Sequence, residues 1–198
     1  MTSIKKREAE LGERFIASFE KLDDMSVFRE TDPVGWSMAT DEPDEYGFKH
    51  WRPIRVETPP ECLEPLYSKL PARLPPLFER LVLSYRWAEV DLQLFTLLAN
   101  PPGPDLKTFS SGIVNSGPLS IFLVRAGYIQ FGKGSGGDYD PVCFDVSSRK
   151  KNRDCRVVKI DHEEILCNDR LKIVAVLASS FEQLVVQTIE KAENSAHT

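Results

Sequence analysis

The sequence predicts a protein of mixed helices and β-strands, built as one domain behind an N-terminal extension. Amphipathic helical patterns occur near both ends of the chain, and a β-hairpin is indicated at residues 128–146. The chain has 198 residues, which is long for one small domain and short for two. We therefore expect a helical and irregular extension over residues 1–57 and a domain over residues 58–194.

The composition is that of a soluble globular protein, with 41% hydrophobic and 28% charged residues. No apolar run approaches the roughly 18 residues that a membrane span needs. Lys5, Lys6 and Arg7 are followed by Glu8 and Glu10 rather than by an apolar segment, so no secretory signal is indicated. We expect a cytoplasmic protein that does not contact a membrane.

The net charge of −5 argues against sequence-independent binding of nucleic acid, which relies on Lys and Arg to neutralise phosphates. The basic residues 149–156 are interpreted as a solvated loop between strands. Without an export signal, reduced thiols are favoured over disulfides, and no histidine stands at metal-ligand spacing from a cysteine. We expect no metal or cofactor. The cysteines are Cys62, Cys143, Cys155 and Cys167.

An amphipathic helix is predicted over residues 5–22, because apolar residues recur there at helical spacing among many charges. Residues 23–57 contain three prolines and an acidic cluster and are interpreted as an irregular connection. Trp36 and Trp51 are expected to anchor this connection on the domain surface. The apolar positions of the helix are Leu11, Phe15, Ile16, Phe19 and Leu22.

Prolines divide the next region into two helices. Pro59 and Pro60 open a short one that Pro71 closes. The second begins near residues 75–76, since proline is tolerated in a first turn, and it ends at about Tyr85. Trp87 is expected at the helix end or in the turn beyond, and the buried positions are Leu77, Phe78, Leu81, Val82 and Tyr85.

Residues 90–95 alternate like a half-buried strand, although residues 94–98 would also fit a helix. Weaker helical passages follow at residues 105–113 and 118–126, the second with Leu119, Phe122 and Leu123 facing inward.

After the hairpin, a strand is predicted over residues 156–160. A helical turn then spans residues 161–166, with Asp161 as its N-cap and Glu164 three positions later. A C-terminal helix runs to about residue 194, and it is capped by Ser179 or Ser180 together with Glu182 or Gln183.

The hairpin contains a pattern that resembles a phosphate-binding loop. Residues 127–133 match the first seven positions of G-x-x-x-x-G-K, but Gly134 stands where Ser or Thr should hold magnesium. The four intervening residues are strand formers, whereas a phosphate loop joins a strand to a helix. We therefore interpret the segment as part of a sheet that binds no nucleotide.

Two further clusters, one of aspartates and one around a histidine, could suggest metal binding or acid–base catalysis, but we interpret both as structural. Asp138, Asp140 and Asp145 depart from the calcium-loop pattern, and aspartates in turns usually cap their own backbone. His162 is surrounded in sequence by acidic residues, but adjacent positions on one helical turn point in different directions. We expect no catalytic and no metal-binding residues.

The order of elements resembles the SUKH superfamily, which includes the fungal Smi-one/Knr-four cell-wall regulators. The resemblance covers roughly residues 63–189 and rests on several segments in sequence. Arg86-Trp87 follow Tyr85 where members of the family often have Asn-Gly. The matching segments are Leu74-Pro75-Pro76-Leu77-Phe78-Glu79-Arg80-Leu81, Gly127-Tyr128-Ile129-Gln130-Phe131-Gly132, Val142-Cys143-Phe144-Asp145-Val146, Val157-Val158 before Asp161-His162-Glu163, and Ala178-Ser179-Ser180-Phe181-Glu182-Gln183-Leu184.

The resemblance implies an α+β domain, in which a mostly antiparallel twisted sheet is flanked by helices, and a non-enzymatic role in binding another protein. Bacterial members are similar in neutralising toxins as immunity proteins, and fungal members act as signalling scaffolds. In the first case, acidic groups would complement a basic toxin surface and occlude its active site. A small hydrolase or nucleotide-binding protein is the competing hypothesis. The predicted partner-binding residues are Asp138, Tyr139, Asp140, Arg86 and Trp87.

Overall fold

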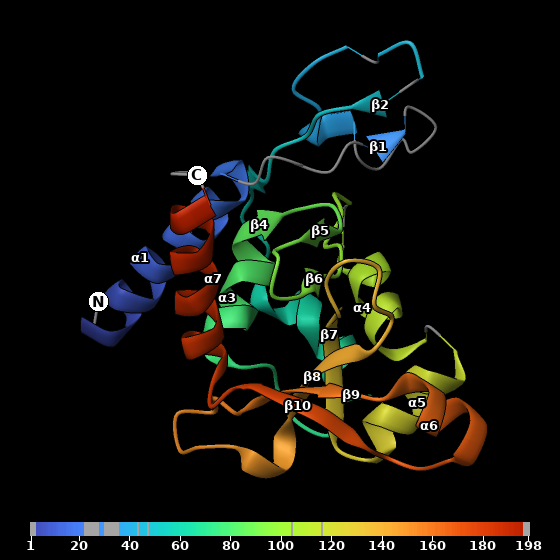
Figure 1. Ribbon diagram of the computed structural model, residues 1–198. Coiled ribbons are helices and arrows are strands. Elements are labelled where there is room, and N and C mark those ends of the chain that lie inside the picture. Colours follow the sequence, from blue (N-terminus) through green and yellow to red (C-terminus); the bar gives the residue numbers. More distant parts are fainter. Residues whose placement is uncertain are drawn as a thin grey trace.

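The computed structural model shows an α+β protein with an N-terminal helix, in which helices flank an antiparallel sheet (Figure 1). This confirms the predicted fold class. The structure describes residues 3–21, 28–29, 36–42, 44–46, 48–103, 105–115 and 117–195.

A six-stranded antiparallel sheet forms the centre of the molecule. Two short antiparallel pairs lie outside it, β1 (Phe28–Arg29) with β2 (Phe48–Lys49) and β3 (Ile54–Arg55) with β4 (Tyr85–Arg86). In order across the large sheet, its strands are β10 (Ile173–Ala178), β9 (Val157–Ile160), β8 (Pro141–Asp145), β7 (Tyr128–Lys133), β6 (Thr96–Leu97) and β5 (Val90–Asp91).

The sheet is strongly twisted, since β7 and β10 run in clearly different directions in Figure 1. β10 is an edge strand, and its residues Ile173, Val174 and Val176 are exposed. Two register shifts interrupt its pairing with β9.

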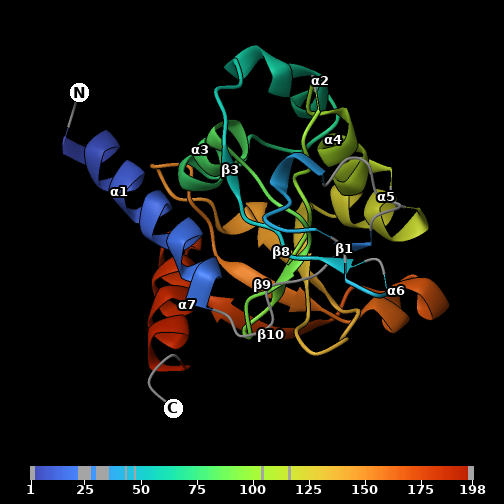
Figure 2. The same cartoon turned by 90° about the horizontal axis from the view of Figure 1, so that it is seen from above.

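Helices cover both faces of this sheet (Figures 1 and 2). α3 begins at Pro76, as predicted, because proline lacks an N–H that the first turn would leave unpaired. The α-helices are α1 (Ser3–Ser18), α2 (Glu64–Tyr67), α3 (Pro76–Ser84), α4 (Lys107–Val114), α5 (Pro118–Arg125), α6 (His162–Asn168) and α7 (Phe181–Ser195). Short 3₁₀ helices occur at Phe19–Lys21, Trp36–Met38, Pro60–Leu63 and Val146–Ser148.

The main core lies between one face of the sheet and helices α1, α3 and α7. Phe131 and Phe144 stack with their ring centroids 4.1 Å apart, and Phe78 and Phe181 meet this pair edge-on or tilted. Phe15 of α1 contacts Phe181, so the N-terminal helix is packed into the same core as the rest of the chain.

A smaller core lies on the other face of the sheet, beneath α5 and α6. Cys143 of β8 and Val158 of β9 pack there against Leu123 and Ile165. Every residue of β8 is buried because successive side chains enter one core and then the other. Leu119 and Phe122 are partly buried against this core, which confirms the predicted inward face of α5.

Several local predictions are confirmed. The side chain of Asp161 caps α6 by accepting a hydrogen bond from the N–H of Glu164 at 3.0 Å. The hydroxyl of Ser180 accepts from the N–H of Gln183, and the Gln183 side chain accepts from the N–H of Ser179. Trp51 is fully buried, whereas the side chain of Trp36 lies outside the described residues.

The predicted strand over residues 90–95 is only partly correct, because β5 covers Val90–Asp91 alone, and the alternative helix over residues 94–98 does not form. β5 and β6 form a hairpin there, closed by a hydrogen bond of 2.8 Å from the N–H of Leu92 to the carbonyl of Phe95. Gln93 occupies the turn with a φ of 65°, a conformation that Gln seldom adopts. β10 was not predicted.

The four cysteines are free, and Cys143 and Cys155 are buried. Burial raises the pKa of Cys155 to about 12, which keeps its thiol protonated at neutral pH. Among the described residues, no helix has both the length and the apolar character required to cross a membrane.

Candidate functional site

The loop over residues 134–140 joins β7 to β8 and is tied to three other elements; we call it the Tyr139 loop. Its first tie is to β5, where the Asp91 carboxylate accepts hydrogen bonds from the Ser135 hydroxyl at 2.7 Å and the Gly136 N–H at 2.8 Å. Burial acts to raise the pKa of Asp91, but these hydrogen bonds outweigh it and the pKa lies below its usual value.

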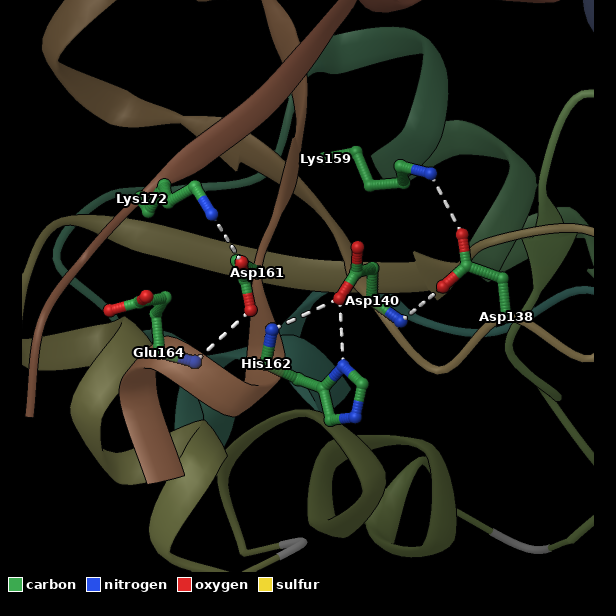
Figure 3. A network of polar contacts seen from close by, with 7 residues as sticks. All are labelled: Asp138, Asp140, Lys159, Asp161, His162, Glu164 and Lys172. Atoms are coloured by element: carbon green, nitrogen blue, oxygen red, sulfur yellow. Dashed lines mark hydrogen bonds and ion pairs between the residues drawn. The ribbon is translucent and has the colours of Figure 1, made fainter. Parts of the chain in front are cut away.

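The second tie joins the loop to β9 (Figure 3). The Asp138 carboxylate lies 2.7 Å from the Nζ atom of Lys159 and also accepts a hydrogen bond from the N–H of Asp140. The Lys159 ammonium lowers the pKa of Asp138, and the carboxylate raises that of Lys159. Both side chains therefore stay charged at neutral pH.

The third tie joins the loop to the start of α6. One oxygen of Asp140 accepts the N–H of His162 at 3.0 Å and lies 2.7 Å from the Nδ1 atom of its ring, as Figure 3 shows. The neighbouring Asp161 instead caps α6 and bonds Lys172 at 2.9 Å. The partner of His162 is thus 22 positions away in sequence, and it is not one of the adjacent acidic residues.

Tyr139 projects from the loop between these ties, with 70% of its surface exposed. The Nζ atom of Lys133 lies 6.0 Å from the centre of its ring, and the His162 ring lies edge-on at 6.4 Å. The residues on both sides of Tyr139 are fixed by side-chain hydrogen bonds. The arrangement presents a large aromatic side chain on an ordered backbone, which is typical of residues that dominate protein interfaces.

Two of the predicted partner-binding residues lie elsewhere. Arg86 and Trp87 are 3% and 1% exposed, so the prediction that they form an exposed surface is wrong. The Arg86 guanidinium donates to the carbonyls of Val82 and Tyr85 and to the hydroxyl of Thr58. The indole N–H of Trp87 donates to the carbonyl of Leu98 at 2.9 Å. Arg86 thus joins β4 to α3, and Trp87 joins the chain after β4 to residues 98 and 100.

Asp138 and Asp140 belong to the site but have a different role from the one expected. Their side chains are 33% and 17% exposed, and each is engaged by a basic or imidazole group of the same chain. These carboxylates therefore hold the loop in place and offer little free charge to a partner. The structure adds Lys159, which local sequence patterns did not indicate, and His162, which the sequence suggested only as part of an acid–base cluster.

The three aspartates considered for calcium do not form one site. Asp140 precedes β8, whereas Asp145 ends it and bonds Arg156 at 2.7 Å and Ser147. Within the described part of the chain, no three His, Cys, Asp or Glu side chains are grouped to hold a metal ion. Residues 128–133, which resemble part of a phosphate loop, form strand β7, whose pairing with β8 shifts register between Gln130 and Gly132.

Comparisons with protein-family models, curated proteins and solved structures find no match to this chain. The SUKH resemblance therefore stays a prediction.

Proposed function

We propose that this protein is a non-enzymatic, SMI/KNR-like protein-binding module that contacts its partner through the Tyr139 loop. The observation that carries the proposal is the exposed Tyr139 ring on a loop tied to β5, β9 and α6. A loop that is already ordered loses little conformational entropy when a partner binds. An exposed tyrosine also offers apolar area and a hydroxyl in one side chain.

In its specific form, the proposal is that of a cytoplasmic immunity protein that neutralises a toxin by covering its active site. Lys133, which bonds Glu89 at 2.7 Å, and His162 place polar groups beside the ring, which suits a partner surface with a polar rim around a hollow that binds the aromatic ring. The alternative is a regulatory scaffold that binds a signalling protein through the same loop.

Affinity capture with Tyr139→Ala tests the binding surface. Tagged wild-type protein and the variant would be incubated with native lysate, and bound proteins would be quantified by mass spectrometry. We expect the variant to recover about tenfold less of the partner than wild-type protein does, or still less, as is usual for a central aromatic contact. Tyr46→Ala is the matched control, since Tyr46 is 74% exposed outside the loop. Equal partner recovery with wild-type protein and Tyr139→Ala would overturn the proposal.

Expression of the captured partner alone distinguishes the two forms of the proposal. A toxin arrests bacterial growth, and coexpression of the wild-type chain restores it while Tyr139→Ala does not. A partner that leaves growth unchanged favours the scaffold and contradicts the immunity function.

A further inference from the structure

A pocket of about 390 Å³ lies between the segment around α2 and helix α4, which are neighbours in Figure 2. This volume is within the range of about 300–1,000 Å³ that is typical of small-molecule sites. Leu66 and Leu106 line its inner part, because they border the pocket and are almost completely buried. The pocket shares no residue with the Tyr139 loop.

Helical spacing explains how one wall of the pocket is built. Lys107, Ser110, Ser111 and Val114 are separated by three, four and seven positions, so they lie on one face of α4. The hydroxyls of Ser110 and Ser111 and the apolar side chain of Val114 thus border the same space.

Several polar groups at this pocket are unused within the protein. The Lys69 ammonium and the hydroxyls of Ser110 and Ser111 have no hydrogen-bond or ion-pair partner among the described residues. Lys107 is paired with Asp105 at 2.7 Å, and their charges cancel. Among the described residues, the pocket therefore combines an apolar interior with an unpaired ammonium at its exposed rim and two unpaired hydroxyls.

We infer that this pocket binds a small molecule with an apolar chain and a single carboxylate. The chain would lie against Leu66 and Leu106, and the carboxylate would accept hydrogen bonds from Lys69 and the two serines. One ammonium matches the charge of one carboxylate, whereas a phosphate carries more charge and is usually met by arginines or several donors.

Cys62 provides a direct readout of occupancy, because its half-buried thiol also lines the pocket. Cys143 and Cys155 are buried, so replacing the exposed Cys167 by Ser leaves Cys62 as the accessible thiol. The rate at which iodoacetamide alkylates Cys62 in Cys167→Ser protein would be measured with increasing octanoate. We expect saturating octanoate to slow the reaction several-fold. Octanol and octylamine at equal concentrations should protect much less, since they lack the carboxylate.

Lys69→Met tests the charge contact. We expect it to weaken octanoate binding about tenfold, the loss typical of one charge-assisted hydrogen bond. Lys151→Met, at an exposed lysine of the loop before β9, should bind octanoate as wild-type protein does. Titration calorimetry on the natural chain would confirm the affinities, and thermal melts would confirm folding. Equal protection by octylamine, no protection by octanoate, or unchanged affinity in Lys69→Met would overturn the inference.

Discussion

Gly134 leaves the space that the side chain of Asp138 occupies. A Cβ atom at position 134 would lie 2.2 Å from the Cγ atom of Asp138 and 2.5 Å from its Cβ atom, far inside contact distance. Any larger residue would therefore displace the carboxylate that bonds Lys159. Gly136 and Gly137 have φ angles of 68° and 85°, which side chains rarely permit. Gly134, Gly136 and Gly137, which follow the phosphate-loop pattern of residues 127–133, thus have a steric role in the Tyr139 loop.

At the residue scale, Gly134→Ala should destabilise the protein by about 1–3 kcal/mol, because the added methyl group overpacks the loop. Partner binding through Tyr139 should weaken as well. Denaturant unfolding followed by circular dichroism measures the first effect. The matched control is Gly112→Ala in α4, where nothing lies within 4 Å of the new Cβ atom. It should be neutral or stabilising by up to about 1 kcal/mol, and a Gly134→Ala protein as stable as this control would contradict the prediction.

Individual residues could be predicted where their partners are near in sequence. The Asp161 cap depends on a residue three positions away and is correct. The burial of Trp87 depends on pairing with Asn100, whose backbone exchanges hydrogen bonds of 2.9 and 3.0 Å with it. The contact between Asp140 and His162 likewise depends on how β8 and β9 align. No local pattern carries such long-range information.

At the scale of elements, most of the errors in the predicted secondary structure occur where the residue types do not indicate the backbone conformation. The turn between β5 and β6 contains Gln93 instead of Gly or Asn, so the alternating pattern appeared to continue through it. β10 consists of six apolar residues in a row, which show no strand or helix period. Proline and capping residues, in contrast, mark the starts of α3 and α7 correctly.

At the scale of elements, the N-terminal cap of α7 is expected to contribute measurably to the stability of the protein. Ser180→Ala removes the oxygen that accepts the N–H of Gln183 at 3.1 Å, and it should lower the free energy of unfolding by about 1 kcal/mol. Glu190→Ala, at an exposed position within α7, should change it by less than about 0.5 kcal/mol. Thermal unfolding under identical conditions compares the two variants. A Ser180→Ala protein that unfolds at the same temperature as the wild type would refute the role of the cap.

At the scale of the whole molecule, carboxylates join segments that are distant in sequence. Asp91 ties β5 to the Tyr139 loop, and Asp138 ties the loop to β9. Asp145 bonds Arg156, across the loop between β8 and β9. Burial acts to raise the pKa of Asp145, but hydrogen bonds from Ser147 and Arg156 outweigh it, and its pKa is lowered like those of Asp91 and Asp138.

These lowered pKa values predict a loss of stability in acid. A carboxyl group with a lower pKa in the folded state binds fewer protons there than in the unfolded chain, whose pKa is near 3.8. The stabilisation is therefore complete well above pH 3.8 and disappears as the pH falls through the folded-state pKa values. Denaturant unfolding at pH 7 and pH 3 should show a clear decrease in stability, with a smaller decrease for Asp138→Asn. Equal stability of the wild-type protein at both pH values would contradict the prediction.

The edge strand β10 has a consequence for the protein in concentrated solution. Its six residues include no charge, and Ile173, Val174 and Val176 are 36%, 47% and 57% exposed. Edge strands without charged or proline residues promote aggregation, whereas bulges bend an edge away from intermolecular pairing. The two register shifts in the pairing of β10 with β9 therefore disfavour aggregation through this edge. If partial unfolding straightens β10, fibril nucleation would begin at this strand.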